Sequence, residues 1–213
     1  MALSVSQLTL HHRNNNIVIG PLTFEVEAGE IMTLMGPSGS GKSTILSAIA
    51  GHLAADFTIT GEIKLNKQSI ISLAPNMRHI GIVFQDDLLF PHLNIWQNLA
   101  FGLPQEIKGR QRKHQALATL DELDLLHLQH QQAHEISGGQ RARISMMRLL
   151  LSQPQAVLLD EPFSKLDKTL RSSFRQFVFD QIQHRNIPAL MVTHDDDDIP
   201  KNGDISHWPW LEK

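Results

Sequence analysis

One segment constrains this chain more than any other, a glycine-rich stretch between an apolar run and an expected helix. The apolar run at Ile31–Met35 predicts a buried strand, and the helix is expected from Lys42 to Gly51. In that setting the glycines allow backbone N–H groups to turn inward around an anion, and the helix start adds a partial positive charge. The stretch fits the pattern G-x-x-x-x-G-K-[ST] and reads Gly36-Pro37-Ser38-Gly39-Ser40-Gly41-Lys42-Ser43-Thr44.

This pattern predicts a loop that binds the phosphates of a nucleoside triphosphate. Lys42 is expected to place its charge on the β- and γ-phosphates, and Ser43 to offer its hydroxyl to Mg²⁺. An incidental glycine-rich turn is the alternative, and the strand before the loop and the helix after it argue against that. The loop alone does not distinguish a kinase from a GTPase or another ATPase.

Two further apolar runs end in polar side chains that suit the same chemistry. Asp160 and Glu161 follow the run Ala156–Leu159, and His194 comes shortly after the run Ala189–Val192. Because the carboxyl ends of parallel strands meet at one edge of a sheet, these side chains are expected to face a common ligand. There Asp160 would hold Mg²⁺, Glu161 would polarise an attacking water, and His194 would hydrogen-bond a γ-phosphate oxygen. The alternatives are a solvated acidic pair and a structural histidine.

Composition narrows the class of molecule. The chain has 213 residues, of which 41% are apolar, enough for a sizeable core. A net charge of −3 gives no general attraction to nucleic acid, and the absence of cysteine excludes disulfides and thiolate metal sites. Residues Met1–Leu10 lack the pattern of a signal peptide, and no apolar run approaches the about 20 residues of a membrane-spanning helix. Any membrane role is therefore expected to depend on a partner.

Alternating strand and helix patterns predict an α/β fold with two parts in one domain, residues 1–213. Residues 1–85 and 152–213 are expected to form the α/β core. Residues 86–151 are expected to form an inserted helical subdomain, because the pattern from Gln105 to Leu151 is mostly helical and rich in Gln, Leu, His and Arg. The expected strands are Leu3–Leu10, Ile17–Val26, Ile31–Met35, Ile59–Leu65, Ile80–Phe84, Ala156–Leu159 and Ala189–Val192, and a helix is expected at Lys168–Arg185.

A second glycine-containing turn lies inside the expected helical subdomain. It reads Ser137-Gly138-Gly139-Gln140, follows Ile136 and precedes a helical run to Leu151. Serine and glycines at a helix start form another anion site, so the chain has two helix starts that suit phosphate. The turn resembles the LSGGQ signature of the ABC transporter ATPases, with isoleucine in place of leucine.

Other landmarks follow in the order found in that family. Phe84-Gln85-Asp86 resembles the Q-loop, which implies that Gln85 contacts Mg²⁺ and the attacking water. Ser164-Lys165-Leu166-Asp167 resembles the D-loop, and Val192-Thr193-His194-Asp195 resembles the segment of the switch histidine. The stretches Phe90-Pro91-His92-Leu93 and Asn98–Leu103 resemble the region after the Q-loop in importer ATPases.

The resemblance implies a P-loop NTPase (RecA-like) core with an antiparallel β subdomain and the inserted helical subdomain. It implies that Ser137, Gly138 and Gly139 of one subunit cover the γ-phosphate of ATP held by the phosphate loop of a second subunit. Two ATPase subunits would then enclose ATP and Mg²⁺ at the cytoplasmic face of the inner or plasma membrane. The expected function is ATP hydrolysis that drives import of a small solute through a separate permease, served by a solute-binding protein.

Three alternatives stand beside this interpretation. An exporter or lipoprotein-release ATPase would share most motifs, and the Phe-Pro-His-Leu stretch argues against it. A non-transport ABC protein acting on DNA or ribosomes usually has tandem cassettes, a coiled-coil insert or a basic face, which this sequence lacks. A nucleotide kinase would share the phosphate loop but has no use for the Ser-Gly-Gly-Gln turn.

The sequence departs from the family in two places. It contains no tyrosine, and the region where family members stack an aromatic residue on adenine reads Leu10-His11-His12-Arg13-Asn14. We expect the planar side chain of His12 or Arg13 to stack there, with weak discrimination between ATP and GTP. The alternative is that no side chain stacks on adenine. In the D-loop, Lys165 stands where a small residue is usual.

Three remaining features have expected structural roles. The acidic run Asp195–Asp198 is predicted to be a solvated turn. His127, His130 and His134 are spaced i, i+3 and i+7 on an expected helix. A solvated helix face is favoured over a metal site because no acid or cysteine pattern completes a zinc spacing. The two tryptophans near the end, Trp208 and Trp210, are expected to close the core.

Overall fold

The computed structural model describes residues 1–13, 18–201 and 203–207. The two tryptophans expected to close the core, Trp208 and Trp210, lie outside these residues, as does Ile17, the first residue of an expected strand. The chain forms two compact units. The first contains Met1–Ile82, Gln155–Glu161 and Phe179–Lys213, and the second contains Val83–Pro154 and Pro162–Val178. The predicted helical subdomain, residues 86–151, lies within the second unit, which also includes residues 162–178.

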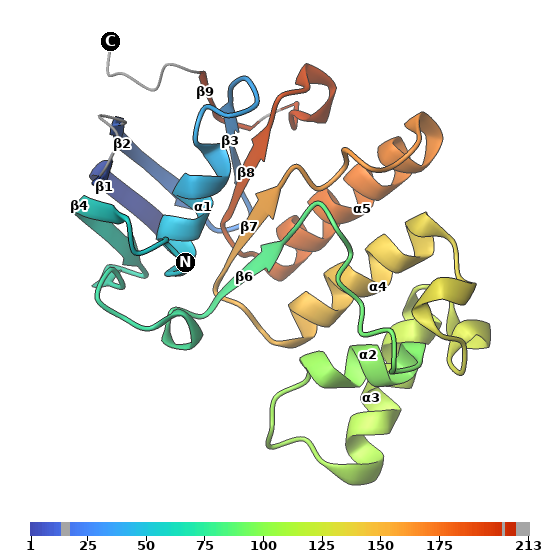
Figure 1. The fold of residues 1–213 in the computed structure, drawn as a ribbon. Coiled ribbons are helices and arrows are strands. Elements are labelled where there is room, and N and C mark those ends of the chain that lie inside the picture. The colour runs from blue at the N-terminus through green and yellow to red at the C-terminus, as the bar shows by residue number, and fades with distance from the viewer. Residues whose placement is uncertain (14–17, 202, 208–213) are drawn as a thin grey trace. The chain divides into compact units, whose positions relative to one another are not determined.

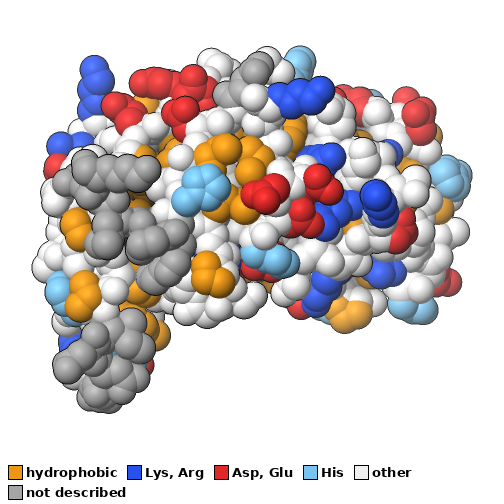
Figure 2. Space-filling view, turned by 90° about the horizontal axis from the view of Figure 1, so that it is seen from above, with side chains coloured by type: hydrophobic (Ala, Val, Ile, Leu, Met, Phe, Trp, Pro, Cys, Tyr) orange, Lys and Arg blue, Asp and Glu red, His pale blue; other side chains and the backbone are white. Residues whose placement is uncertain are grey.

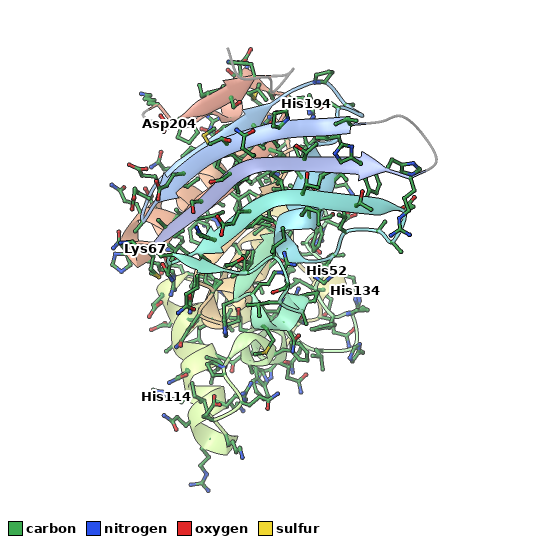
Figure 3. All side chains as sticks on the ribbon, turned by 90° about the vertical axis from the view of Figure 1, so that its left-hand side faces the viewer. His52, Lys67, His114, His134, His194 and Asp204 are labelled. Atoms are coloured by element: carbon green, nitrogen blue, oxygen red, sulfur yellow. The ribbon has the colours of Figure 1, made fainter. Side chains whose placement is uncertain are left out.

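An antiparallel sheet forms one side of the first unit. Its strands are β1 (Ala2–His12), β2 (Val18–Glu27), β4 (Phe57–Leu65) and the short β5 (Gln68–Ser69), in the order β2-β1-β4-β5. Figure 3 shows the three long strands lying side by side, with Lys67 in the turn between β4 and β5. Leu3, Val5, Leu8 and Leu10 of β1 are buried, as expected for a sheet with one face on a core, and a register shift between Val5 and Leu8 interrupts the alternation.

A parallel sheet of five strands carries the rest of the first unit's core. The strands are β3 (Ile31–Met35), β6 (Ile80–Val83), β7 (Ala156–Asp160), β8 (Ala189–Thr193) and β9 (Ile205–His207), in the order β6-β7-β8-β3-β9. Every residue of β3 and β8 is buried. This is the pattern of central strands covered on both faces, and it explains why they are continuous apolar runs in the sequence.

Helix α1 (Lys42–Ala50) packs between the two sheets of this unit (Figure 1). Its residues Ile45 and Ile49 are fully buried in one cluster with side chains of both sheets. At its carboxyl end the Arg78 guanidinium donates to the carbonyls of Ala48 and Ile49, at 2.9 and 2.8 Å. Those bonds satisfy carbonyls that a helix end leaves without a partner inside the helix, so Arg78 fixes the end of α1.

The second unit is mostly helical. It contains α2 (Ile95–Gly102), α3 (Gly109–Glu122), α4 (Gly138–Leu151) and the short 3₁₀ turns η2 (Leu126–Leu128) and η3 (Ala133–Glu135). Helix α2 packs against both α3 and α4. A Cβ on Gly102 would lie 2.0 Å from the carbonyl oxygen of Arg148, so only glycine allows this close approach of α2 to α4. Helix α5 (Lys168–Arg185) begins in this unit and ends in the first.

The predicted fold class is confirmed, and the apolar runs mark the strands well. The prediction for the three histidines is wrong in one respect. His127 lies in η2, His134 lies in η3, and His130 lies between these two 3₁₀ turns, so they do not share one helix. All three are exposed, and no cluster of metal-ligating side chains is found in the described part of the chain.

The predicted solvated turn at Asp195–Asp198 is also corrected. It contains a 3₁₀ turn, η4 (Asp196–Asp198), and the Asp198 side chain is buried. Two further short elements are η1 (Pro75–Met77) and an isolated bridge between Asn94 and Gln132. Among the residues described, no helix is both long and apolar enough to cross a membrane.

Candidate functional site

Three neighbouring strands of the parallel sheet end at the same level. Asp160, the last residue of β7, pairs in register with Val192 of β8, and Met35, the last residue of β3, pairs with Thr193. The next residues along the chain are therefore the first to leave the sheet at this edge. They are Gly36, Glu161 and His194. This is the arrangement predicted from the apolar runs, and it follows from parallel pairing alone.

The phosphate loop depends on backbone conformations that favour glycine. Gly39 and Gly41 have φ angles of +81° and +91°, in the left-handed region. A side chain at Gly41 would also place its Cβ 2.4 Å from Cδ1 of Ile19 in β2. Gly41 is the residue that caps the start of α1, so the loop leads into the helix end whose N–H groups attract anions.

The Lys42 ammonium folds back over the loop. Its side chain is 5% exposed, and Nζ donates to the carbonyls of Gly36 and Pro37 at 2.6 and 2.9 Å. Nζ also lies 3.8 Å from Oε1 of Glu161. The buried positive charge is thus held between the loop carbonyls and the acid that follows β7, the place where a triphosphate would enter.

Ser43 and Asp160 form a second contact at the start of α1. The Ser43 hydroxyl donates to Oδ1 of Asp160 at 2.9 Å. Burial raises the pKa of the Asp160 carboxyl, while the Ser43 hydrogen bond lowers it, the neighbouring Glu161 raises it and Lys42 lowers it. A bound cation beside this pair would stabilise the ionised carboxylate.

The residues present fit Mg²⁺ and phosphate. Hydroxyl and carboxylate oxygens, such as those of Ser43 and Asp160, are the hard donors that Mg²⁺ prefers. The hydroxyl of Ser40 in the phosphate loop is buried and has no hydrogen-bond partner among the residues that the structure describes. A buried polar atom without a partner costs free energy, which a ligand oxygen could recover.

Glu161 and His194 lie together at the open side of the cluster. Nδ1 of His194 is 3.1 Å from Oε1 of Glu161, and the side chains are 50% and 21% exposed. Glu161 has a φ angle of +45°, and its backbone N–H donates to the carbonyl of Val192 at 3.0 Å. A left-handed conformation is uncommon outside glycine, and such strain gathers at functional sites. The strained backbone carries the acid that the sequence predicts as the catalytic one.

The structure therefore brings together one part of the predicted site. Lys42, Ser43, Asp160, Glu161 and His194 form a single cluster in the first unit, next to the loop residues 36–41. Gln85 and the turn of Ser137, Gly138, Gly139 and Gln140 belong to the second unit.

In the second unit, Ser137 caps α4. Its hydroxyl accepts from the N–H of Gln140 at 3.3 Å, and the Gln140 side chain accepts from the N–H of Ser137 at 2.9 Å. Two N–H groups at this helix start are thereby satisfied within the chain. Ser137 itself is exposed and Gly138 is partly exposed. Gly139 is buried, and a Cβ at this position would lie 3.1 Å from Cδ2 of Leu170. The turn predicted to meet a second subunit's nucleotide is thus accessible at Ser137.

The two residues predicted to contact adenine differ in their surroundings. His12 Nε2 lies 2.8 Å from Oδ2 of Asp56, and its ring meets the Phe57 ring edge-on, with 4.8 Å between centroids. Its side chain is 14% exposed, whereas Arg13 is exposed. The adenine contact remains a prediction for both residues.

Two side-chain contacts, one in each unit, were not found from the sequence. Thr193 donates to the buried carboxylate of Asp198 at 3.0 Å and accepts from the N–H of Asp195 at 3.1 Å, which fixes the turn after His194. The burial of Asp198 could not be predicted, because the sequence Asp195–Asp198 does not distinguish one aspartate from the others. The second is an ion pair between Asp87 and Arg141, which lie 54 residues apart.

The surface carries charges of both signs. On the face shown in Figure 2, the described Lys and Arg side chains are interspersed with Asp and Glu side chains and do not form a continuous basic surface. Such a mixed distribution gives no strong field of one sign.

Comparisons with known proteins agree with this site. A model of the ABC transporter family (ABC_tran) matches residues 19–164, which include the phosphate loop, the Ser137 turn and the acids Asp160 and Glu161. The ABC transporter ATP-binding protein YnjD of Escherichia coli (strain K12) is 47% identical over 190 residues, 88% of each chain.

Import proteins are also among the relatives. The Fe(3+) ions import ATP-binding protein FbpC 2 of Pectobacterium atrosepticum is 42% identical over 186 residues, and the spermidine/putrescine import ATP-binding protein PotA of Bacillus anthracis is 33% identical over 194 residues. These matches cover 85% and 91% of this chain. They cover 53% and 58% of the relatives, so this chain spans little more than half their length.

Solved structures show the same fold. CbiO1 of Clostridium perfringens, part of the ABC transporter complex cbiONQ, has a TM-score of 0.82 at 25% identity and covers 96% of this chain and 83% of its own. An inward-facing ABC transporter of metal-chelate type has a TM-score of 0.75 at 28% identity, over 92% of this chain and 75% of its own. Since the family model spans residues 19–164 and the YnjD match covers most of both chains, this chain belongs to the ABC transporter family as an ATP-binding subunit that hydrolyses ATP.

Proposed function

We propose that two copies of this chain enclose two ATP molecules and drive the import of a small solute through a separate membrane permease. The subunit would bind peripherally at the cytoplasmic face of that membrane, with a solute-binding protein delivering the solute. The import function of the FbpC and PotA relatives supports the direction of transport. The observation that carries the proposal is the cluster of Lys42, Ser43, Asp160, Glu161 and His194 where β3, β7 and β8 end.

Each side chain of the cluster has a role that its contacts support. Lys42 would exchange its bonds to the loop carbonyls for bonds to the β- and γ-phosphates, because a buried ammonium gains more from a phosphate than from neutral carbonyls. Ser43 and Asp160, already in contact, would hold Mg²⁺ with Gln85. When bound, Mg²⁺ supplies positive charge against the charge on the phosphoryl oxygens. The remaining loop residues, Gly36, Pro37, Ser38, Gly39, Ser40, Gly41 and Thr44, would surround the phosphates.

Glu161 is the residue proposed to orient the attacking water. Its carboxylate is partly buried and lies between the Lys42 ammonium, at 3.8 Å, and the His194 ring, at 3.1 Å. An acid in this position can accept a hydrogen bond from water while His194 donates to a γ-phosphate oxygen. Catalysis of phosphoryl transfer consists largely of such positioning, so the preformed contact between the two side chains supports this assignment.

The exposed Ser137 turn supports pairing of two chains. Each chain has one phosphate loop and one Ser-Gly-Gly-Gln turn at the start of α4. A helix start with an exposed serine suits a phosphate, and two-fold symmetry would create two equal sites from one pair of chains. ATP would then join the subunits through its negative charge, and loss of the γ-phosphate would release them.

The second unit offers a surface for the permease. Phe84, Leu88 and Phe101 have exposed fractions of 45%, 54% and 64%, and Phe101 stacks edge-on against Phe90. Large apolar side chains that are exposed to water mark a protein–protein contact site when they gather on one surface. We propose that the region from Gln85 to Leu103 receives a helix of the membrane partner.

The test is the mass of the Glu161→Gln variant with Mg²⁺-ATP, measured by analytical ultracentrifugation. This variant keeps the side-chain volume but cannot polarise water, so it is expected to stay dimeric with ATP bound. Lys42→Ala serves as the control, because it should lose ATP binding and remain monomeric. A Glu161→Gln chain that binds ATP and stays monomeric would contradict the proposal.

A further inference from the structure

One face of α4 binds a short stretch of chain within the second unit. Arg141, Ser145 and Arg148 are spaced i, i+4 and i+7, so their side chains lie along one face of the helix. Their partners are two consecutive residues. Arg141 binds the Asp87 carboxylate, Ser145 donates to the Asp87 carbonyl, and Arg148 donates to the Leu88 carbonyl.

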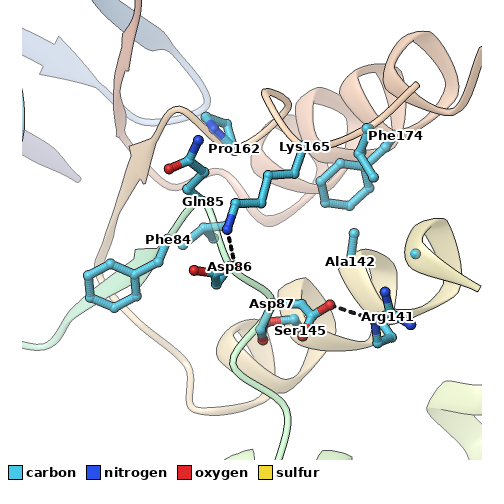
Figure 4. Close-up of a pocket in the computed structure, with 13 residues that line it drawn as sticks. Phe84, Gln85, Asp86, Asp87, Arg141, Ala142, Ser145, Pro162, Lys165 and Phe174 are labelled. Carbon is cyan, nitrogen blue, oxygen red and sulfur yellow. Dashed lines mark hydrogen bonds and ion pairs between the residues drawn. The ribbon is translucent and has the colours of Figure 1, made fainter. Parts of the chain in front are cut away.

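The contact between Asp87 and Arg141 also reaches the start of α4. Nε of Arg141 lies 2.8 Å from Oδ2 of Asp87, and Nη1 of the same guanidinium donates to the carbonyl of Ile136 at 2.8 Å. Ile136 directly precedes Ser137, the residue that caps α4. Figure 4 shows the pair in the pocket that Gln85 also lines. One guanidinium therefore connects the chain two residues after Gln85 with the residue before Ser137.

The backbone of this stretch is strained, and α4 holds it. Leu88 has a φ angle of +45°, and the Ser145 hydroxyl donates to the carbonyl just before it at 2.5 Å. Nη2 of Arg148 donates to the Leu88 carbonyl at 2.8 Å, and its guanidinium lies 4.8 Å from the centroid of the Phe90 ring. A bulky residue keeps a left-handed conformation when its surroundings determine it, so these bonds fix the path of the chain.

The neighbouring acid has a weaker anchor. Asp86 pairs with Lys165, but these side chains are 64% and 51% exposed, against 31% and 34% for Asp87 and Arg141. Exposed ion pairs contribute little because water screens the charges. Of the two acids that follow Gln85, Asp87 is therefore the one that fixes the segment.

We propose that Asp87 is a positioning residue for ATP hydrolysis, which makes Gln85 and Ser137 move as one body. Its carboxylate on Arg141 and its carbonyl on Ser145 attach the segment of Gln85 to the first two turns of α4. A displacement of Gln85 or of Ser137 would then be transmitted to the other residue through these hydrogen bonds rather than through a flexible loop. The inference rests on the proposed role of Gln85 in catalysis.

The test compares the steady-state kinetics of ATP hydrolysis in Asp87→Asn, Arg141→Gln and the double variant. Asp87→Asn is expected to lower kcat about tenfold, the size of effect for one lost charge-assisted hydrogen bond. The affinity for ATP, measured by titration calorimetry, should stay within about twofold because the phosphate loop is untouched. The double variant should lose no more than Arg141→Gln alone, since both changes break the same pair. Asp87→Glu should recover part of kcat.

Two further variants separate the possible outcomes. Glu62→Gln is the matched control, because Glu62 and Lys64 form an ion pair of the same 2.8 Å length on the surface of β4, and it should keep the wild-type kcat. Gln85→Ala should lower kcat. Two results would overturn the inference about Asp87 and leave the proposed role of Gln85 intact. The first is a full kcat in Asp87→Asn together with a lowered kcat in Gln85→Ala. The second is that the losses of kcat in Asp87→Asn and Arg141→Gln multiply in the double variant. Full kcat in Gln85→Ala would overturn the proposed role of Gln85 and the inference together. Arg141→Gln provides the same comparison if Asp87→Asn does not fold.

Discussion

The hydroxyl of Ser43 donates a hydrogen bond of 2.9 Å to Oδ1 of Asp160, a residue 117 positions away in the sequence. This bond joins the first turn of α1 to the end of β7. It therefore unites the two halves of the site, the loop that suits phosphate and the strand that carries the acids. The burial that comes with this contact raises the pKa of Asp160, so the site is less stable when the carboxylate is ionised and no metal ion is bound beside it.

The first prediction concerns that cost. An acid whose pKa is raised on folding binds more protons in the folded chain, so its contribution to stability falls as pH rises from the ordinary aspartate range through the raised pKa. Asp160→Asn removes the ionisation and can still accept the Ser43 hydrogen bond. Without nucleotide, its midpoint of thermal unfolding should exceed that of the wild type at pH 7, and by less at pH 4. A variant with the lower midpoint at pH 7 would count against a cost of burying Asp160.

The second prediction concerns the strained backbone at Glu161. A left-handed residue other than glycine costs about 1–2 kcal/mol, and part of that is offset by the greater freedom of glycine in the unfolded chain. Glu161→Gly should therefore be more stable to urea than Glu161→Ala by about 1 kcal/mol, although both lose the carboxylate and should not hydrolyse ATP. Equal stability of the two variants would show that the φ angle of +45° is not a source of strain.

The third prediction tests the adenine contact. The His12→Ala/Arg13→Ala double variant should bind ATP and GTP more weakly by a similar factor, about three- to tenfold, because stacking on a planar side chain does not distinguish the bases strongly. His114→Ala is the control, since Figure 3 shows His114 on α3 in the other unit. Titration calorimetry measures both affinities. Unchanged binding of both nucleotides would mean that neither side chain stacks.

The fourth prediction concerns the turn that carries His194. Thr193→Val removes the hydroxyl that bonds the buried Asp198 carboxylate and the N–H of Asp195. The loss should lower the free energy of unfolding by about 1–3 kcal/mol. Asp196→Asn, on an exposed neighbour, should change it by less than about 0.5 kcal/mol. Urea denaturation measures both, and similar small effects would show that the Thr193 bonds contribute little.

Much of this site could be predicted from the sequence because its elements are local. The apolar runs of β3, β7 and β8 mark three buried strands, and parallel pairing then places Gly36, Glu161 and His194 at one edge. Gly39 and Gly41 mark the loop in the sequence, because their positive φ angles are ones that favour glycine.

The features that were missed depend on contacts between distant segments. The burial of Asp198 depends on Thr193 and on how the turn after β8 folds, which a run of four acids does not reveal. The expected helix with three histidines was wrong because two 3₁₀ turns replace it. The pairing of Asp87 with Arg141 joins residues 54 positions apart, and neither charge alone indicates its partner.

The central claim is that each ATP site is shared by two chains, and complementation between two inactive variants tests it most directly. Lys42→Ala removes the phosphate-binding charge. Gly138→Asp places a negative charge at the Ser137 turn, where an added Cβ would lie 3.7 Å from Nη2 of Arg141.

Each variant alone should not hydrolyse ATP. In an equimolar mixture, a pair that combines one chain of each kind has one intact site of two, because the phosphate loop of the Gly138→Asp chain meets the Ser137 turn of the Lys42→Ala chain. A shared site predicts that the mixture hydrolyses ATP although neither variant does so alone. A mixture that stays as inactive as its components would contradict it.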